Sequence, residues 1–337
     1  MSMVIPAPIS STCIPVLPKR GQISWFEIVL LVMSFGLVVS GVAPSLQDVI
    51  LLSFLFAGLG LAWNIAGGYA GLISFGHSAF FGVGAYTSTI LLLRYDISPW
   101  IGIWAGAVIA GLFGAALALI CARLRGPFFI LSTLAFAEVV RIGALNWVSL
   151  TGGPEGLSIP PMASLVGMVF ASKTTYAALM LGYLVFVYAI TKGLEASRFG
   201  YYLFAIRDNE DAAGAAGVNP LLGRTAVMAL SAALTGVGGS LFAQYFLYLD
   251  PTYVISPELS FQFALLPAVG GLATAIGPVL GSFLITPLSE LLRSHLGNAA
   301  AGLHLVIYSF GLIVVMLYFP AGLAGALNKL THWRPFR

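Results

Sequence analysis

Long apolar runs separated by short polar segments make up most of the chain. A helix that spans a bilayer needs about 20 mostly apolar residues. The runs that reach or approach this length are 23–43, 49–66, 71–93, 101–122, 128–148, 175–190, 225–247, 261–292 and 303–319. The run 261–292 is too long for one simple span and is interrupted at Gly270–Gly271 and at Gly277–Pro278. The pattern therefore predicts an all-α polytopic membrane protein with about 9–10 transmembrane helices, some of them glycine-broken or re-entrant.

The basic residues of the loops predict the orientation of the spans, because Lys and Arg gather on the cytoplasmic side. If 261–292 crosses twice, only Arg94, Lys173 and Arg293 lie opposite the other loop cations, whereas a single crossing weakens this asymmetry. We therefore expect two crossings and cytoplasmic termini, although a re-entrant loop beside one span fits the same run. The expected organisation is a cytoplasmic tail 1–21, a transmembrane domain 22–327 and a cytoplasmic tail 328–337, with the first run serving as an uncleaved signal anchor.

Composition agrees with a bilayer environment. Of the 337 residues, 59% are hydrophobic and only 8% are charged, against about 25% charged in soluble domains. The mean hydropathy of +0.98 is more than a compact soluble protein could hide. The net charge of +3 does not indicate a nucleic-acid partner. The two cysteines and four histidines are scattered, so we predict no disulfide framework, no metal site and no metal enzyme.

The segment 195–224 is the only long charged stretch. Asp208, Asn209, Glu210 and Asp211 are favourable at the start of a helix, because their side chains accept hydrogen bonds from free backbone N–H groups. A short helix over about 210–216 is expected, ended by a glycine at 217. Such a helix between two spans is either an ordinary connector or a lever on which a partner pushes, and the residues alone favour the connector.

Two glycine-rich interruptions resemble each other, one at 67–76 and one at 270–278. Paired breaks of this kind are typical of transporters whose binding site is built from broken helices, but glycine also serves close helix packing. A neutral His77 could bond a backbone carbonyl that the break frees, and this structural role is favoured over substrate contact. The residues that we expect beside a translocation path are Gly67, Gly68, Gly71, Ser74, His77, Gly270 and Gly271.

Glu138 and Arg141 are three residues apart inside the predicted span 128–148. Ionisable side chains in a bilayer are costly and are usually paired or functional. We favour a self-compensating pair that fixes helix packing, and keep a polar lining of the translocation path as the alternative.

A resemblance changes the interpretation of the segment 195–224. Asp211-Ala212-Ala213, followed by Gly217, resembles the coupling-helix signature of ATP-binding-cassette (ABC) importer permeases, with Asp in place of the usual Glu. From about 49 to 327 the chain resembles the branched-chain amino-acid ABC transporter permease family, in its LivM-like branch. The segments that carry the resemblance are 64–86, 151–157, 205–217, 270–281 and 319–323.

The resemblance implies a subunit of an import complex in the bacterial inner membrane. Its expected partners are a second related permease, two cytoplasmic ATPases and a substrate-binding protein, which together move branched-chain or other small hydrophobic amino acids by alternating access. The residues implied in coupling to the ATPases are Arg207, Asp211, Ala212, Ala213 and Gly217. The chain itself binds no cofactor and is not an enzyme in this view, because no lysine follows a glycine as a phosphate-binding loop requires, and ATP is used by the partners.

Other functions remain open at this stage. A urea or short-amide permease of the same superfamily would share these motifs. An ion-coupled secondary transporter would place a carboxylate in its spans, for which Glu138 is the candidate. A membrane enzyme would need clustered polar residues at one depth, and the sequence shows none. The exact substrate, and whether the permease pair is a homodimer or a heterodimer, are not encoded in these patterns.

Overall fold

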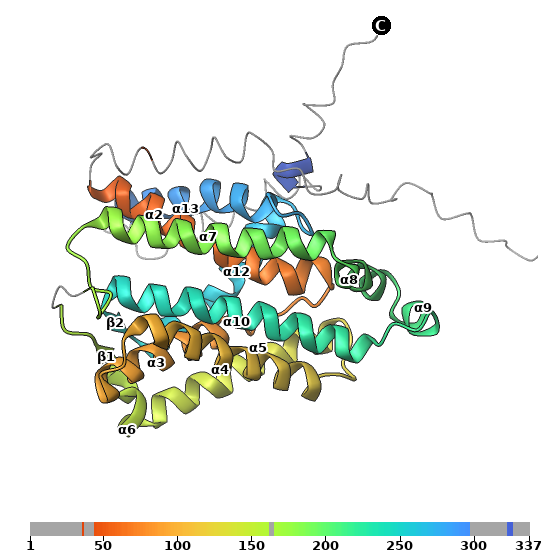
Figure 1. The fold of residues 1–337 in the computed structure, drawn as a ribbon, viewed down its shortest axis with the longest axis horizontal. Coiled ribbons are helices and arrows are strands. Elements are labelled where there is room, and N and C mark those ends of the chain that lie inside the picture. Colours follow the sequence, from red (N-terminus) through yellow and green to blue (C-terminus); the bar gives the residue numbers. More distant parts are fainter. Residues whose placement is uncertain (1–35, 37–43, 162–164, 297–321, 326–337) are drawn as a thin grey trace, which may run out of the picture.

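The computed structural model describes residues 36, 44–161, 165–296 and 322–325 (Figure 1). The predicted spans 23–43 and 303–319 and both predicted tails lie outside the described residues, apart from residue 36. The described chain is almost entirely helical, which confirms the predicted fold class. In chain order the elements are α2 (Pro44–Asn64), η1 (Ile65–Tyr69), α3 (His77–Tyr95), α4 (Pro99–Ile120), α5 (Pro127–Asn146), α6 (Val148–Thr151), η2 (Gly153–Glu155), β1 (Leu157–Ser158), α7 (Lys173–Ala196), α8 (Arg198–Asp208), α9 (Glu210–Ala215), α10 (Pro220–Phe246), β2 (Tyr248–Leu249), α11 (Pro251–Val254), α12 (Pro257–Gly270) and α13 (Gly277–Leu296).

Five helices in the described ranges are long and apolar enough to cross a membrane: Leu46–Tyr69, Pro99–Ile120, Pro127–Asn146, Lys173–Ala196 and Pro220–Phe246. They confirm the predicted runs 49–66, 101–122, 128–148, 175–190 and 225–247. The run 71–93 is corrected, because its helix begins only at His77. Residues 70–76 are not helical, and Gly71 takes the left-handed φ of +69°. A hydropathy pattern misses this break because the segment is as apolar as a helix.

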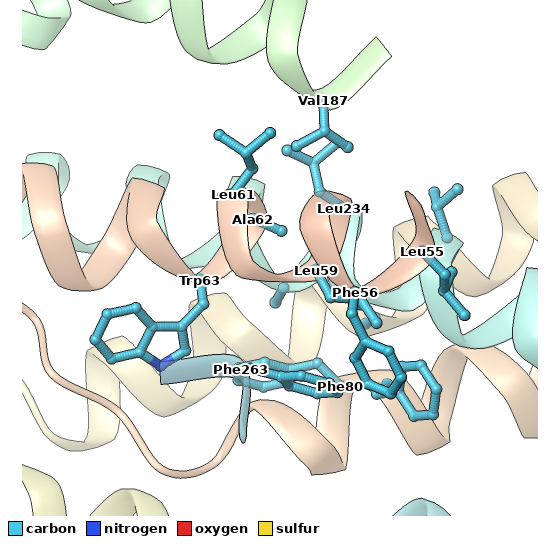
Figure 2. Close-up of a cluster of buried hydrophobic side chains, with 14 of the residues drawn as sticks. Leu55, Phe56, Leu59, Leu61, Ala62, Trp63, Phe80, Val187, Leu234 and Phe263 are labelled. Carbon is cyan, nitrogen blue, oxygen red and sulfur yellow. The ribbon is translucent and has the colours of Figure 1, made fainter. Parts of the chain in front are cut away.

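Helices α2 and α10 form the centre of the bundle, with α3, α4, α7, α12 and α13 packed around them. Nearly every side chain of α2 from Leu51 onward is buried. Figure 2 shows Val187 of α7 on one side of α2, and Phe80 of α3 and Phe263 of α12 on the other. By contrast α5 exposes a whole stripe, on which Phe128 and Val139 are 70% and 68% exposed. This stripe faces lipid or another chain, since a bilayer does not penalise exposed apolar side chains.

The bundle has two chemically distinct ends. Helix α2 runs from Asp48, which accepts a hydrogen bond from Tyr245 at the end of α10, to η1, where Tyr69 donates to Glu195 at the end of α7. Helices α8 and α9 project from the end that carries η1, which we call the α9 end (Figure 1). The opposite end carries α6 and the antiparallel pair of β1 with β2, and is called the β end.

The run 261–292 reverses direction between α12 and α13. Two crossings and a re-entrant loop beside one span both require this reversal, whereas a single crossing does not. From β2 at the β end, the chain crosses the bundle through α11 and α12 to residues 271–276 at the α9 end. Helix α13 then returns along α2, where the Ser282 hydroxyl donates to the Ser53 carbonyl at 2.8 Å. Glycines permit this tight hairpin, since a Cβ on Gly270 would lie 1.7 Å from the Gly277 carbonyl oxygen.

Candidate functional site

The first break begins where α2 passes into a short π-helix, η1. The π-helix, whose turns are wider than those of an α-helix, is followed by Gly71, which adopts a left-handed φ. Next to it the N–H of Leu72 donates to the Ala66 carbonyl at 3.0 Å. A carbonyl without a partner costs several kcal/mol in hydrocarbon. The freed carbonyl of Ser74 is satisfied by the indole N–H of Trp63 at 2.7 Å.

The second break, residues 271–276, lies at the same end of the bundle. Gly271 and Ala273 have φ values of +133° and +56°. The Thr274 hydroxyl donates to the Gly271 carbonyl at 2.8 Å and accepts from the Gly277 N–H at 3.1 Å, which closes the turn before α13. Gly322, in the described C-terminal fragment, packs directly on this turn, because a Cβ there would lie 2.6 Å from the Gly271 Cα.

One side chain joins the two breaks. Asn64, the last residue of α2, is fully buried. Its amide nitrogen donates to the Thr274 carbonyl at 2.9 Å, and its amide oxygen accepts from the Ala273 N–H at 3.0 Å. Gly68 must remain small here, since a Cβ would lie 2.0 Å from the Asn64 oxygen and 2.7 Å from the Ala273 nitrogen. The two glycine-rich segments that resemble each other in sequence are therefore neighbours in space.

Helix α8 holds the first break from the outer side. The guanidinium of Arg207 donates to the Gly68 carbonyl at 2.9 Å, and its stem covers Gly71, where a Cβ would lie 2.7 Å from the Arg207 Cγ. Phe204 lies between, with its ring 5.2 Å from the Arg207 guanidinium and 5.4 Å from the Tyr69 ring. Arg207, predicted to be a coupling residue, thus faces the bundle rather than the solvent.

Helix α9 is short and its start is fixed by charge. The Asn209 side chain accepts from the Ala212 N–H at 3.0 Å, as the sequence predicted for the start of this helix. Arg125, in the loop between α4 and α5, pairs with Glu210 and with Asp211 at 3.2 Å each. Arg224 of α10 pairs with Glu210 at 2.8 Å. The hydrogen bond that Arg125 donates to Asp211 and the charge of Glu210 raise the pKa of Arg125 above its usual value.

The outer face of α9 is made of small residues. Ala212, Gly214, Ala215, Ala216 and Gly217 are exposed, whereas Ala213 is buried against the bundle. A Cβ on Gly214 or Gly217 would meet no atom within 4 Å. The predicted coupling residues therefore divide into an outward set, Asp211, Ala212 and Gly217, and an inward set, Arg207 and Ala213. A partner's backbone could approach the outward set closely.

Ser74 and His77 lie deeper in the bundle and are fully buried. The His77 Nε2 lies 2.8 Å from the Ser231 hydroxyl, which itself donates to the Ala62 carbonyl at 2.6 Å. Because that hydroxyl has one hydrogen, His77 donates and carries its proton on Nε2. The sequence predicted a bond from His77 to a carbonyl freed by the break, and the hydroxyl of Ser231 links the ring to the Ala62 carbonyl of α2. Gly67, Gly68, Gly270 and Gly271 lie nearer the α9 end.

Glu138 and Arg141 form the predicted pair on one turn of α5. The Arg141 Nε donates to Glu138 at 2.9 Å, and a second nitrogen bonds the other carboxylate oxygen. The two side chains are 41% and 25% exposed, on the border between the packed and the exposed stripe of α5. A path lined by this pair would therefore run along the outside of this chain, against a neighbour.

Sequence reasoning missed several residues of the α9 end. Asn64 was noticed only as the first residue of a motif, although an amide inside an apolar run is itself a signal. Tyr69 and Glu195 form the short bond that fixes the end of η1, at 2.5 Å. Arg125 and Arg224 were counted only as loop charges, since nothing in the sequence tells that they share Glu210.

The sequence of this chain matches a known family of membrane proteins. The sequence model of the family described as "Branched-chain amino acid transport system / permease component" matches residues 45–319, which include both breaks and α9. The chain belongs to this family. It is a multi-pass membrane permease, as its apolar helices independently indicate.

Individual relatives agree. The chain is 28% identical over 274 residues to the high-affinity branched-chain amino acid transport system permease protein LivM of Salmonella typhimurium and to that of Escherichia coli, in each case over 73% of this chain. The matched region spans 63% of the length of these two relatives. The nucleoside ABC transporter permease protein NupC of Lactococcus lactis is 25% identical over 78% of this chain and 88% of its own length. No solved structure matches the chain.

Proposed function

We propose that the chain is the permease subunit of an ABC importer for branched-chain or other small hydrophobic amino acids. The observation that carries this proposal is α9, a short capped helix that projects from the bundle with its small outward face open (Figure 1). The family match over 45–319 and the names of the LivM relatives support the importer and its substrate class.

Two cytoplasmic ATPases dock on the complex in this proposal, one of them on α9. Asp211 begins the docking surface, and Ala212 and Gly217 let the partner approach the backbone. The α9 end then faces the cytoplasm, and both termini lie on that side. The substrate-binding protein delivers its cargo at the β end, where Gly152, Gly153 and Gly156 shape the loop before β1.

A second related permease completes the translocation path. The exposed stripe of α5, with the ion pair of Glu138 and Arg141 at its border, is the surface that such a neighbour would cover. ATP binding and hydrolysis in the partners drive alternating access, and this chain needs neither a metal nor a cofactor of its own. The inner membrane is the site of the complex.

Nucleosides are a second candidate cargo, because the match to NupC covers more of that relative's length than the match to LivM does of LivM. The apolar helices do not by themselves choose between an amino acid and a nucleoside as cargo. Urea and short amides remain a third possibility from the sequence.

The test is uptake of labelled leucine, uridine and urea by cells that carry the whole transporter, with and without this chain. Leucine uptake that requires the chain and ATP, and survives collapse of ion gradients, is the expected result. Loss of uridine or urea uptake instead would overturn the substrate. Uptake that collapses with the ion gradient would overturn the ABC importer itself.

A further inference from the structure

We propose that Arg207 and Asn64 act in series as a mechanical relay, through which movement of α8 and α9 displaces both glycine breaks together. This inference rests on the proposed function, since it supplies the link between ATPase docking and the opening of the path. Arg207 and Asn64 are positioning residues in it, and neither needs to touch the substrate.

The first link is the bond between Arg207 and Gly68. Arg207 Nε faces Asp208 at 3.4 Å, and the terminal nitrogen Nη1 donates to the Gly68 carbonyl at 2.9 Å. Helix α8 leads into α9 through Asn209 alone, so a push on α9 displaces Arg207. A guanidinium keeps its charge at every physiological pH, so a change of pH in this range does not remove the donor.

The second link is Asn64. Only three residues of η1 separate it from Gly68, and a Cβ on Gly68 would overlap its amide oxygen. The Asn64 side chain makes two hydrogen bonds to the turn 271–276: its amide nitrogen donates to the Thr274 carbonyl, and its amide oxygen accepts from the Ala273 N–H. Because one rigid amide makes both bonds, the end of α2 and this turn move as one unit or lose both bonds together.

The backbone between the links is suited to transmit rather than absorb the motion. Gly67, Gly68 and Gly71 add no side chain to the core, so the buried side chains of Ile65 and Tyr69, together with hydrogen bonds, set the position of this stretch. A π-helical turn inside an α-helix is often found at a functional site. The bond between Tyr69 and Glu195 ties the same stretch to α7 but reaches no residue of the second break.

The β end of the bundle contains contacts that we expect to stay fixed during transport. There β1 and β2 are paired through their backbones, and the Ile159 N–H donates to the Leu247 carbonyl at 2.8 Å. At the α9 end the joints between the two breaks and α8 are single side chains. Side-chain bonds can be made and lost in a cycle without unfolding an element.

The experiment uses the full transporter reconstituted in vesicles, in which imported leucine and hydrolysed ATP are measured together. Arg207→Met keeps the stem over Gly71 and removes the guanidinium, and Asn64→Ala removes both bonds to the second break. Matched controls are Arg198→Met, an exposed arginine of the same helix, and Asn146→Ala, an exposed asparagine of α5.

The relay predicts that leucine imported per ATP falls about tenfold in either variant, the effect of one charge-assisted hydrogen bond in Arg207→Met and of two neutral hydrogen bonds in Asn64→Ala. The controls keep the wild-type ratio, and the double variant falls no further than the worse single variant, because both residues act in one series. Unchanged ratios in both variants, or a double variant equal to the product of the single effects, would overturn the relay.

Two further measurements distinguish a failure of the relay from misfolding of the variants and from a failure of the proposed function. If Asn64→Ala prevents assembly, Arg207→Met decides alone, since this side chain is 27% exposed and its loss leaves the core intact. An equal fall of transport and hydrolysis, at an unchanged ratio, would mean a structural role and contradict the relay. A wild-type complex that imports leucine without using ATP would overturn the proposed function, and the relay with it.

Discussion

The two ends of the bundle are held together by different chemistry. At the β end backbone pairing of Leu157 with Leu249 and of Ser158 with Tyr248 joins the chain, in addition to side-chain bonds such as that of Tyr245 to Asp48. At the α9 end it is joined by side chains: Asn64 bridges the two breaks, and Arg207 holds the first of them. Backbone pairing fixes geometry, whereas side-chain bonds can exchange partners. We infer that the β end is a fixed platform and that the α9 end moves.

The largest effect is expected from a side chain in the fixed end. In Gly156→Val a Cβ would lie 2.1 Å from the Leu249 carbonyl oxygen, and the φ of +69° would be strained as well. Strain of this kind costs about 1–3 kcal/mol before any clash is counted. The amount of folded protein extracted from membranes should fall at least about tenfold. Gly143→Ala, where a Cβ meets nothing within 4 Å, is the control and should leave that amount unchanged.

A change in the mobile end should act on transport and spare folding. Gly217 has a φ of +88° and its N–H donates to Gly214 at 3.0 Å. In Gly217→Pro the φ is forced to about −65° and the donor is lost, so the exit from α9 is rebuilt. We expect leucine uptake to fall at least about tenfold at an unchanged amount of protein. Gly214→Ala is the matched control in open space, and normal uptake by Gly217→Pro would refute the role given to α9.

The ion pairs that hold α9 should have a smaller effect. Glu210 and Arg224 are 19% and 16% exposed and lie 2.8 Å apart. A pair at this depth contributes about 1 kcal/mol, so either Glu210→Gln or Arg224→Gln should lower uptake about fivefold. The double variant should be no worse than the stronger single variant, because Glu210→Gln already removes the pair with Arg224 as well as the pair with Arg125. Strictly multiplied effects in uptake assays would show that the two residues act separately.

The smallest effect is expected away from both ends, when both charges of the α5 ion pair are removed together. Glu138→Gln alone leaves Arg141 unpaired in a span, which costs about 2.5–3.5 kcal/mol at mid-depth. The double variant Glu138→Gln with Arg141→Gln removes both charges, and its uptake should stay within about twofold of wild type. If Glu138 were an ion-coupling site, the double variant would lose uptake completely and the assay would reveal it.

Local features were predictable to the extent that neighbouring residues decide them. Asn209 and the acidic residues after it predict the start of α9, and the helix Glu210–Ala215 matches the expected 210–216 within one residue. The breaks near Gly67 and Gly270 were visible as glycine clusters. The start of α3 was not, because Ser74 and Phe75 sit in an apolar segment that hydropathy cannot distinguish from helix.

Long-range contacts were beyond such reasoning. Asn64 meets Ala273 and Thr274, more than 200 positions later, and no local pattern encodes which turn an amide will reach. The same is true of Arg125 and Glu210, which come from different loops. The resemblance of the two glycine segments predicted a shared role, yet not that one side chain would join them.

The most direct test of the difference between the ends is hydrogen–deuterium exchange of the whole transporter, with and without ATP held in its ATPases. The account predicts that amide exchange changes in 65–76, 210–217 and 271–276, while the paired amides of 157–159 and 247–249 keep their protection. A change confined to the β end, with the two breaks and α9 unaltered, would contradict it.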